Sequence, residues 1–347
     1  MKTLVMTGGG TGGHIIPNLA LIPTLKKHFK IYYLGEKDSL EEELISKTQG
    51  VEFVPIRAVK FARKLSPKNL LIPFKLLTYI NETKKILKKI KPNIIFAKGG
   101  YVSIPVAFAG HSLKIPILAH ESDFTMGLAN KLILKKSKVM FTSFRETCVG
   151  NKCLYSGNPI REEIFSGNKL IARKNCKFIT DKKVLMFFGG SMGSKTINDF
   201  VFENLKHLKD YNIIHFVGKN KGKDIKADNY FQIEYASNIY DYFALADVVI
   251  CRAGANSIFE LLALKKLMLL IPLSKAESRG DQIENANVFK KNGFAQVLEE
   301  EELSLDNFLK KINNIFKNSD FYIKNMENEG KNTANDLICD YLLDYSR

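Results

Sequence analysis

The sequence lacks any run of about 18 uncharged apolar residues, the length that a membrane-spanning helix requires. Its start, Met1-Lys2, leads into a short apolar stretch and then glycines, which is too short for the core of a signal peptide. We therefore expect a protein that stays in the cytosol.

Cysteine is scarce, and no two cysteines form a C-x-x-C pair. The five residues are Cys148, Cys153, Cys176, Cys251 and Cys339. An odd number without such a pair suggests neither a disulfide framework nor a zinc site. Reduced, structural thiols are expected, and no metal or other cofactor.

Negative charge is scarce in the first half of the chain only. Residues 1–160 hold 25 Lys and Arg against 10 Asp and Glu, whereas residues 161–347 hold 27 against 26. The segment 57–91 alone carries 11 basic residues against Glu82. Such a segment suits an anionic surface or nucleic acid. Nucleic acid is disfavoured, because aliphatic rather than stacking aromatic residues interleave the charges and no nucleic-acid motif occurs.

Short β-rich runs alternate with helical patterns along the whole chain, which predicts α/β domains with parallel sheets. The length favours two domains. We place the junction at residues 156–161, giving domains 1–158 and 159–330 that face each other across a cleft. Thirteen strands are expected. They lie near residues 3–7, 31–34, 53–56, 94–97, 117–120, 139–142, 154–155, 184–188, 213–217, 231–235, 248–251, 268–271 and 295–298.

Glycine-rich loops follow the first strand of each domain. Residues 8–13 read G-G-G-T-G-G and precede a helix expected to begin about Pro17, a pattern that lets backbone N-H groups approach a phosphate. The same residues satisfy G-x-G-x-x-G, and Glu36 stands where an acid could bind a ribose, so a nicotinamide-dependent oxidoreductase is an alternative. A second loop, G-G-S-M-G-S, occupies residues 189–194.

A third loop follows the strand at 248–251. Asn256 or Ser257 is expected to cap the next helix, with Glu260 about one turn further on. A carboxylate there can accept two hydrogen bonds from a ribose diol, although it can equally complete a capping box.

Eight motifs in order resemble one family over nearly the whole chain. They are G-G-T-G-G-H (9–14), G-G-Y-V-S (99–103), H-E-S-D (120–123), G-L-A-N-K (127–131), G-N-P-I-R (157–161), G-G-S-M-G (189–193), A-D-V-V-I-C-R-A-G-A (246–255) and D-Q-x-x-N-A (281–286). The family is that of the bacterial N-acetylglucosaminyltransferases that convert lipid I to lipid II in peptidoglycan synthesis. The resemblance implies a GT-B fold, UDP-N-acetylglucosamine as donor, a lipid-linked acceptor, and a last helix at about 331–347 that packs back on the first domain.

The resemblance also assigns the site residues. It places Thr11, Gly12 and Gly13 at the donor sugar and diphosphate, Arg161 and Ser191 at the nucleotide, and Ala236 at the uracil edge. The remaining substrate-binding candidates are Asp123, Asn130, Gly193, Ala255, Asn256, Ser257, Glu260 and Gln282. Two residues depart from the pattern: the family commonly shows H-E-Q-N where this chain has H-E-S-D, and a glutamine where it has Met192. Asp123 thus replaces an amide by a group that only accepts hydrogen bonds when ionised.

Transfer from a UDP sugar needs a base for the acceptor hydroxyl and stabilisation of the departing diphosphate. His14 is the first candidate for the base, because imidazole titrates near neutral pH, and Glu121 is the second. No Asp-x-Asp pair, the usual metal anchor of the other large glycosyltransferase fold, occurs. The family implies inversion at the anomeric carbon.

Residues 70–80 are too short to span a bilayer but suit its interface, with lysines on anionic headgroups. The alternative is a core helix with a solvated lysine face. The candidate membrane contacts are Leu70, Leu71, Ile72, Phe74, Leu76 and Leu77. We expect a peripheral protein on the cytoplasmic face of the membrane, with other enzymes of cell-wall synthesis as further candidate partners. Another lipid-linked acceptor is the alternative within the same fold.

Overall fold

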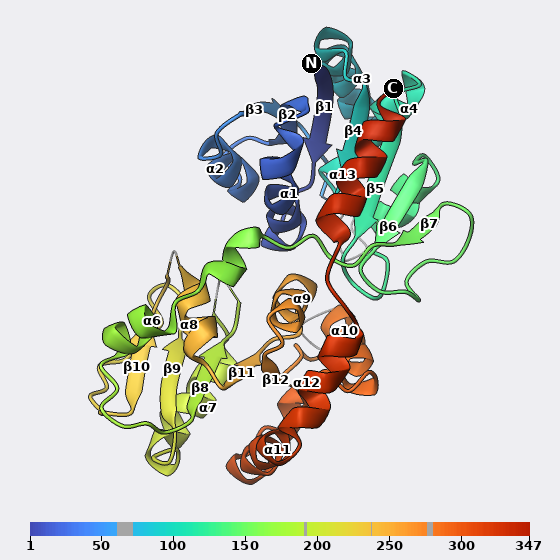
Figure 1. Cartoon of the computed structure of the whole chain (residues 1–347). Helices are drawn as coiled ribbons and strands as arrows, with labels where there is room; N and C mark the ends of the chain where they lie inside the picture. Colours follow the sequence, from blue (N-terminus) through green and yellow to red (C-terminus); the bar gives the residue numbers. More distant parts are fainter. Residues whose placement is uncertain (61–71, 191–192, 237, 276–279) are drawn as a thin grey trace. The chain divides into compact units, whose positions relative to one another are not determined.

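The computed structural model describes residues 1–60, 72–190, 193–236, 238–275 and 280–347 (Figure 1). The chain divides into two compact units. The first comprises Met1–Arg161 with Asn332–Arg347, and the second comprises Glu162–Lys331. The boundary expected from the sequence lies after residue 158, whereas in the structure the first segment of the first unit extends to Arg161.

The first unit is built on a seven-stranded parallel sheet in the order β3-β2-β1-β4-β5-β6-β7. Its strands are β1 (Lys2–Thr7), β2 (Phe29–Glu36), β3 (Val51–Ile56), β4 (Ile94–Ala97), β5 (Ile117–Glu121), β6 (Val139–Thr142) and β7 (Cys153–Tyr155). Its helices are α1 (Gly12–Leu25), α2 (Leu40–Ser46), α3 (Ile72–Ile90), α4 (Ser103–Ser112), α5 (Leu128–Leu134) and α13 (Ala334–Tyr345). The strand order reverses between β1 and β4.

Two apolar clusters fill the two faces of this sheet, because alternate residues of a strand point to opposite sides. Leu4 and Met6 of β1 belong to the cluster that includes Leu21 of α1. Val5 belongs to the other cluster, with Leu87 of α3. Every one of these side chains is at most 1% exposed.

The C-terminal helix α13 completes the first cluster. Ile338 and Leu342 are buried in it, and Asn335 holds both backbone groups of Ile160, through its Nδ2 (2.8 Å to the oxygen) and its Oδ1 (3.1 Å to the nitrogen). Figure 1 draws this helix in red beside β4 of the first unit. The chain therefore returns to the first unit after the second is complete.

The second unit repeats the plan with six parallel strands in the order β10-β9-β8-β11-β12-β13. The strands are β8 (Val184–Phe188), β9 (Asn212–Phe216), β10 (Tyr230–Ile233), β11 (Val248–Cys251), β12 (Leu267–Leu270) and β13 (Gln296–Val297). The helices are η2 (Glu162–Ser166), α6 (Lys169–Cys176), α7 (Lys195–Asn204), η3 (Leu205–His207), α8 (Ile239–Leu245), α9 (Ala255–Ala263), α10 (Asp281–Lys291), η4 (Glu300–Glu302), α11 (Leu305–Lys317) and α12 (Ser319–Asn328). Here the order reverses between β8 and β11.

All thirteen expected strands are present among the described residues, with ends that move by at most two residues. The start of the first helix was predicted wrongly. Helix α1 begins at Gly12 rather than about Pro17, because the last two glycines already adopt helical backbone and Pro17 lies inside the helix. The first turn of α1 thus belongs to the glycine loop itself.

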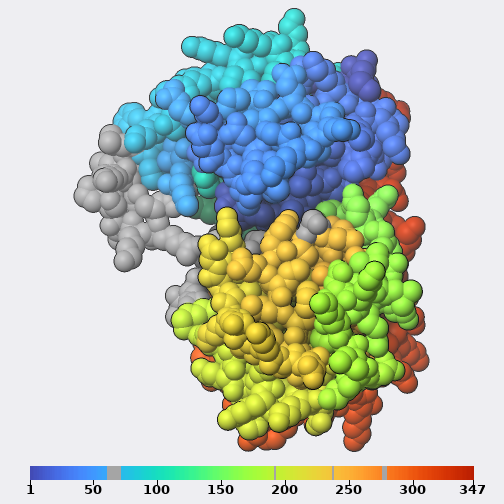
Figure 2. Space-filling model, turned by 90° about the vertical axis from the view of Figure 1, so that its left-hand side faces the viewer, coloured from blue at the N-terminus to red at the C-terminus, as the bar shows by residue number. Residues whose placement is uncertain are grey.

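Helix α3 carries exposed apolar residues beside its lysines. Phe74 is 70% exposed and Leu77 is 60% exposed, whereas Ile72 and Leu76 are half-buried. Leu70 and Leu71 lie outside the described residues. Figure 2 shows the part of the chain that contains α3, coloured light blue to cyan, on the surface of the first unit. Within the described residues, no helix combines the length and apolarity needed to cross a membrane.

Replacing Leu342 with alanine tests the packing of α13. Leu342 is fully buried, so Leu342→Ala should lower the free energy of unfolding by about 2–5 kcal/mol, as measured by urea denaturation. Leu77→Ala, at an exposed leucine of the same unit, is the control and should change it by less than about 0.5 kcal/mol. Equal effects of the two substitutions would contradict this packing.

Candidate functional site

The loops that follow β1 and β4 meet at the point where the strand order of the first unit reverses. Gly100, with a φ of +78°, lies so close to the first glycine loop that a Cβ atom there would stand 2.3 Å from the backbone oxygen of Gly9. Only glycine fits this position. In open parallel sheets such a switch point, at the carboxyl ends of the strands, is where ligands bind.

A buried carboxylate supports the first glycine loop from below. Glu41 of α2 is 1% exposed and accepts hydrogen bonds from the backbone N-H of Gly10 (3.4 Å) and of Glu36 (3.3 Å). The Glu36 side chain in turn accepts a hydrogen bond from the Tyr101 hydroxyl (2.5 Å). The acid that a dinucleotide ribose would need is therefore engaged within the protein, which disfavours the oxidoreductase alternative.

His14 lies in the first turn of α1, and its Nδ1 is 3.1 Å from the backbone oxygen of Gly9 and 3.1 Å from the Thr11 hydroxyl. A carbonyl oxygen only accepts hydrogen bonds, so the proton of the neutral imidazole belongs on Nδ1. The lone pair is then on Nε2, the atom that could remove a proton from a substrate. Gly12 and Gly13 are the helix residues that precede it.

Glu121 ends β5, and the surrounding segment encloses its carboxylate. It accepts hydrogen bonds from the backbone N-H of Asp123 (3.1 Å) and of Gly127 (3.0 Å), and from Nδ2 of Asn130 (2.9 Å). Asn130 itself is 2% exposed and also donates to the backbone oxygen of His120. These contacts make Glu121 and Asn130 supports of the 121–130 segment, and they favour His14 as the base.

The second unit forms its own loop cluster where β8 and β11 diverge. Gly193 has a φ of +68°, and a Cβ atom there would stand 2.1 Å from the backbone oxygen of Val217. Ser194 then caps α7, accepting from the N-H of Ile197. Ser191 and Met192 lie outside the described residues.

Arg252, directly after β11, ties the loops of this edge together. Its Nη1 donates to the backbone oxygens of Ile271 and Pro272 (both 3.2 Å), and its Nη2 donates to Oγ of Ser194 (2.8 Å) and to Oε1 of Glu300 (2.5 Å). Arg252 and Glu300 have only 8% and 12% of their side chains exposed. Burial raises the pKa of Glu300, but hydrogen bonds from Arg252 and Thr196 outweigh it, so the pKa is lowered from its usual value.

The expected cap of α9 is wrong. The N-cap residue is Gly254, in an extended conformation, so Ala255, Asn256 and Ser257 form the first turn and none of their side chains caps it. The reason is that glycine leaves the extended turn unhindered, and the helix can start before the first polar residue. Glu260 therefore lies in the second turn, where it is 7% exposed.

The other predicted residues of the second unit lie in loops at the same edge. Ala236 follows β10 and precedes α8. Gln282, in the first turn of α10, accepts a hydrogen bond from the backbone N-H of Leu273 (3.1 Å) and so joins α10 to the loop after β12.

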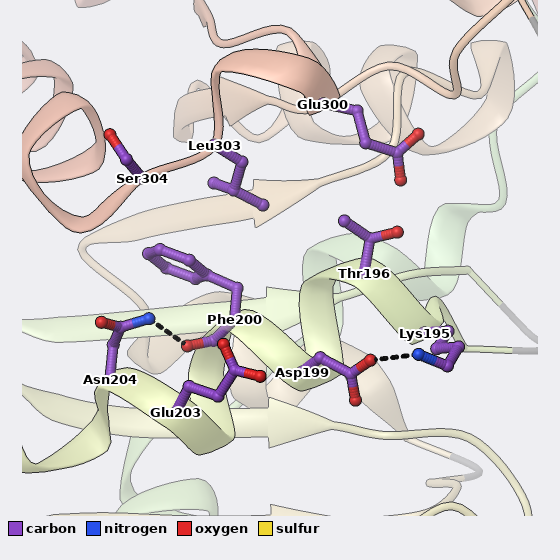
Figure 3. Close-up of a pocket in the computed structure, with 9 residues that line it drawn as sticks. All are labelled: Lys195, Thr196, Asp199, Phe200, Glu203, Asn204, Glu300, Leu303 and Ser304. Atoms are coloured by element: carbon purple, nitrogen blue, oxygen red, sulfur yellow. Dashed lines mark hydrogen bonds and ion pairs between the residues drawn. The ribbon is translucent and has the colours of Figure 1, made fainter.

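The second unit also contains two cavities. One, of about 440 Å³, lies between α7 and the segment from η4 to α11, and its lining includes the acids Asp199, Glu203 and Glu300 (Figure 3). An acidic lining is unsuited to a diphosphate. The other, of about 520 Å³, includes Val184 and Asp247, which lie at the amino ends of β8 and β11. Among the described residues, no group of three or more His, Cys, Asp or Glu could hold a metal ion.

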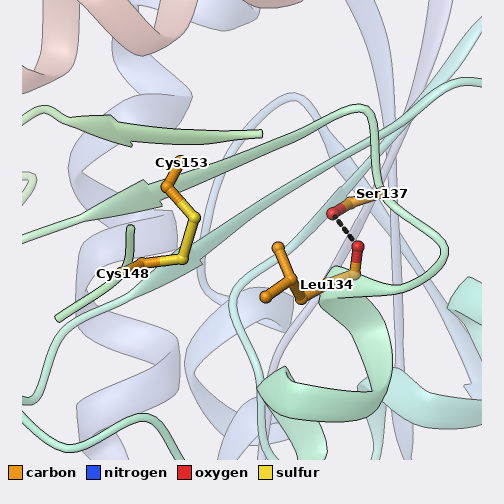
Figure 4. The surroundings of a disulfide bond; sticks show 4 residues. All are labelled: Leu134, Ser137, Cys148 and Cys153. Atoms are coloured by element: carbon orange, nitrogen blue, oxygen red, sulfur yellow. Dashed lines mark hydrogen bonds between the residues drawn. A yellow bond between two sulfur atoms is a disulfide. The ribbon is translucent and has the colours of Figure 1, made fainter. Parts of the chain in front are cut away.

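The expectation of reduced cysteines is wrong for one pair. Cys148 and Cys153 form a disulfide, with their Cα atoms 5.7 Å apart (Figure 4). A turn in which the N-H of Cys153 donates to Gly150 (3.0 Å) folds the segment before β7 back and brings the two together, which the five-residue spacing had not indicated. The other three cysteines are free and buried.

Sequence reasoning missed the buried charged residues that hold the loops. Lys98 and Arg252 each follow a wholly buried strand directly, at β4 and β11. That position was a usable signal, because a charge next to a core strand needs specific partners. Glu41 gave no such signal, since it stands among three consecutive glutamates at the start of α2.

Two parallel sheets, each with glycine loops at its switch point, define the GT-B class of glycosyltransferase fold. Two family models match this chain: the glycosyltransferase family 28 N-terminal domain at residues 4–142 and the family 28 C-terminal domain at residues 184–341. The chain belongs to glycosyltransferase family 28.

Relatives and one solved structure agree with this family. A Clostridium tetani protein named UDP-N-acetylglucosamine--N-acetylmuramyl-(pentapeptide) pyrophosphoryl-undecaprenol N-acetylglucosamine transferase is 46% identical, over 99% of this chain and 98% of its own. A Clostridium botulinum (strain Alaska E43) protein of the same name is 48% identical, over 98% and 97%. The crystal structure of Acinetobacter baumannii MurG matches 99% of this chain and all of its own with a TM-score of 0.78 at 22% identity, a likeness of fold. The resemblance inferred from the eight motifs is confirmed.

Replacing Arg252 with methionine tests whether it holds the loops of the second unit. Arg252→Met leaves a nearly buried Glu300 without its cation, and the free energy of unfolding should fall by about 3–5 kcal/mol at pH 7. Because the folded-state pKa of Glu300 is lowered, its contribution is present above about pH 4.5 and is lost as the pH falls through the folded-state pKa. This part of the acid sensitivity should disappear in the variant, as measured by urea unfolding from pH 3 to 7.

Lys195→Met provides the matched control. Lys195 pairs with Asp199 at 2.6 Å, but its side chain is 89% exposed, so its loss should change stability far less than the loss of Arg252. If the two variants lost the same stability, the bridging role of Arg252 would be wrong.

Proposed function

We propose that this protein transfers N-acetylglucosamine from UDP-N-acetylglucosamine to the muramyl 4-hydroxyl of undecaprenyl-diphosphate-linked muramoyl-pentapeptide, lipid I, giving lipid II for peptidoglycan. The observation that carries the proposal is the 46–48% identity to relatives named for this transfer, over at least 97% of both chains.

The donor nucleotide is assigned to the loop edge of the second unit. Helix α9 begins at Ala255 after the glycine N-cap Gly254, and we assign the diphosphate to this helix start, at Ala255, Asn256 and Ser257. Glu260, one turn further, is assigned to the ribose hydroxyls. Ser191, Gly193, Ala236 and Gln282 stay predictions from the family resemblance.

The reaction is proposed as a single in-line displacement. The acceptor hydroxyl oxygen attacks the anomeric carbon while the bond from that carbon to the diphosphate oxygen breaks, and UDP leaves with the bonding electrons. Nε2 of His14 takes the hydroxyl proton, because the hydrogen bond from Nδ1 to Gly9 places the lone pair on Nε2. One displacement at the α-linked donor inverts the configuration and gives a β linkage.

The departing diphosphate carries the charge that must be stabilised. We assign this to N-H groups of the glycine loops and helix starts and to Arg161, without a metal or other cofactor. Thr11, Gly12 and Gly13 at the start of α1 are the first-unit residues assigned to the donor sugar and diphosphate. Substrate binding by Asp123 and Asn130 stays a prediction from the family resemblance.

Helix α3 is proposed to place the first unit on the cytoplasmic face of the membrane. The helix exposes two large apolar side chains, Phe74 and Leu77, and three lysines, Lys75, Lys85 and Lys88. Apolar side chains beside lysines suit the surface of an anionic bilayer. A peripheral enzyme could then reach a lipid-linked acceptor. Association with other enzymes of cell-wall synthesis stays a prediction.

Two variants separate donor binding from chemistry. Glu260→Ala should weaken UDP-N-acetylglucosamine binding in calorimetry by tenfold or more, because the ribose loses its acceptor. His14→Asn should bind the donor within about threefold of wild type but lower kcat on a lipid I analogue by about 10²–10⁴-fold, since only proton removal is lost.

Glu121→Gln is the control for the base. Its larger effect should be on KM, because Glu121 supports a segment rather than reacting. If the wild-type protein bound NAD and did not bind UDP sugars, the proposed function would be wrong. If it bound UDP-N-acetylglucosamine but used only a different lipid-linked acceptor, the acceptor assignment alone would be wrong. A loss of kcat in Glu121→Gln that exceeded that in His14→Asn would reverse the assignment of the base.

The membrane assignment is tested with vesicles. Phe74→Ser should weaken binding to vesicles rich in anionic phospholipid in a sedimentation assay by several-fold, because a large apolar side chain no longer enters the interface. Phe165→Ser, at a phenylalanine of the second unit that is 63% exposed, is the matched control and should leave binding unchanged. Equal loss in both variants, or binding that is indifferent to lipid charge, would contradict the role of α3.

A further inference from the structure

Lys98 is a fully buried lysine directly after β4. Its backbone N-H extends the sheet by donating to Thr7 (2.8 Å), while its side chain is 0% exposed and ranks among the largest completely buried side chains of the described residues. Its Nζ donates to Oγ of Ser122 at 2.5 Å. Burying an ammonium group is costly unless it has partners of opposite charge, so a lysine at a core position needs a reason.

Three loops meet through this lysine. An ammonium group only donates, so the Ser122 hydroxyl accepts from Lys98 and donates onward to Oδ1 of Asn158 (2.7 Å), which also accepts from Ser143 (3.1 Å). Asn158 is 1% exposed. The Lys98–Ser122–Asn158 chain therefore links the loops that follow β4, β5 and β7.

The charged groups around Lys98 come from the segment after β5. Burial lowers the pKa of Lys98 to about 8, and the charges of Glu121 and Asp123 oppose that shift. His120 also faces this region, and its pKa is lowered well below the usual value, first by burial and then by Lys98. Glu121 makes the larger of these two charge contributions and Asp123 the smaller, so Lys98 offsets both acids of this segment.

Asp123 is also the residue at which this chain departs from the H-E-Q-N pattern of its family. The departure changes two neighbours together, a glutamine to Ser122 and an asparagine to Asp123. The serine hydroxyl is the group that Lys98 holds, and the aspartate is a charge that Lys98 offsets. One buried lysine thus accounts for both changes.

We propose that Lys98 is a positioning residue that acts through Ser122 and Asp123, fixing the loop after β5 and balancing the acid that replaces an amide beside the substrate. Lys98, Ser122 and Asp123 act together: the Lys98 ammonium group holds the Ser122 hydroxyl, and its positive charge offsets the negative charge of Asp123. The proposal rests on the transferase activity proposed above, because the segment is assigned to the donor by that activity.

A double-mutant cycle on kcat/KM tests the set, with Lys98→Met, Asp123→Asn and the double variant. Methionine keeps the volume of lysine without its charge, so Lys98→Met alone should lower kcat/KM by tenfold or more, since the acids lose their counter-charge. The loss from Lys98→Met should be several-fold smaller in the Asp123→Asn background than in wild type, because one of the two acids that Lys98 offsets is then neutral. Effects that simply multiply would overturn the proposal.

The pH profile separates positioning from a merely structural role. Wild-type kcat/KM should fall above about pH 8, as Lys98 loses its proton, and this limb should be absent from the double variant. A limb that persisted unchanged in the double variant would assign it to another group and contradict the proposal. If wild-type protein has no transferase activity, the proposed function fails, whereas an active wild type with an unaffected Lys98→Met refutes only this inference.

Folding is checked by thermal unfolding of every variant. If Lys98→Met fails to fold but the double variant folds, the charge balance is supported, because removing the aspartate charge has repaired the defect. If neither folds, Ser122→Ala decides: it breaks the link from Lys98 to Asn158 while keeping both charges. It should raise KM by several-fold with kcat little changed, and a wild-type KM would overturn the proposal.

Discussion

Parallel strands constrain everything else in this protein, because all of their carboxyl ends reach the same edge of a sheet. In each unit the strand order reverses once, between β1 and β4 and between β8 and β11, and the backbones that leave these strands diverge there. The glycines of the first loop let the backbone turn closely at that point, and Gly100 brings the neighbouring loop against it. Loops that are far apart in the sequence thus become neighbours for a structural reason before any chemistry is considered.

Close backbone loops need support from beneath, and in both units the support is a buried charge. Glu41 accepts from the N-H of Gly10 in the first loop and of Glu36 at the end of β2, whereas Arg252 donates to carbonyl oxygens and to Ser194 in the second unit. The sign of each charge matches the groups it meets, because a carboxylate accepts from N-H groups and a guanidinium donates to carbonyl and hydroxyl oxygens. A charged group can meet several such dipoles at once, which an uncharged side chain of the same size could not.

The strands, the glycine loops and the family were predictable from the sequence because each depends on local pattern: apolar runs, turn residues and motif order. The start of α1, the cap of α9 and the Cys148–Cys153 disulfide were not, because each depends on how the backbone turns over a few residues, for which residue identity is a weak guide. The partners of Lys98 and Arg252 were hidden for a different reason. They come from segments 19 or more residues away, and only the folded sheet brings them together. The roles of the individual site residues stay predictions.

The two candidate bases illustrate what geometry adds to residue type. From the sequence His14 is the first candidate and Glu121 the second. His14 lies beyond the end of β1 and Glu121 is the last residue of β5, both at the carboxyl edge of the sheet. The structure gives Glu121 three donors, from two backbone N-H groups and Asn130, and these contacts hold its carboxylate within its own segment. His14 is oriented instead by a carbonyl oxygen, which fixes the proton on Nδ1 and leaves Nε2 the basic nitrogen. The hydrogen bonds therefore make Glu121 a support for its loop and leave His14 with a ring nitrogen that is able to accept a proton.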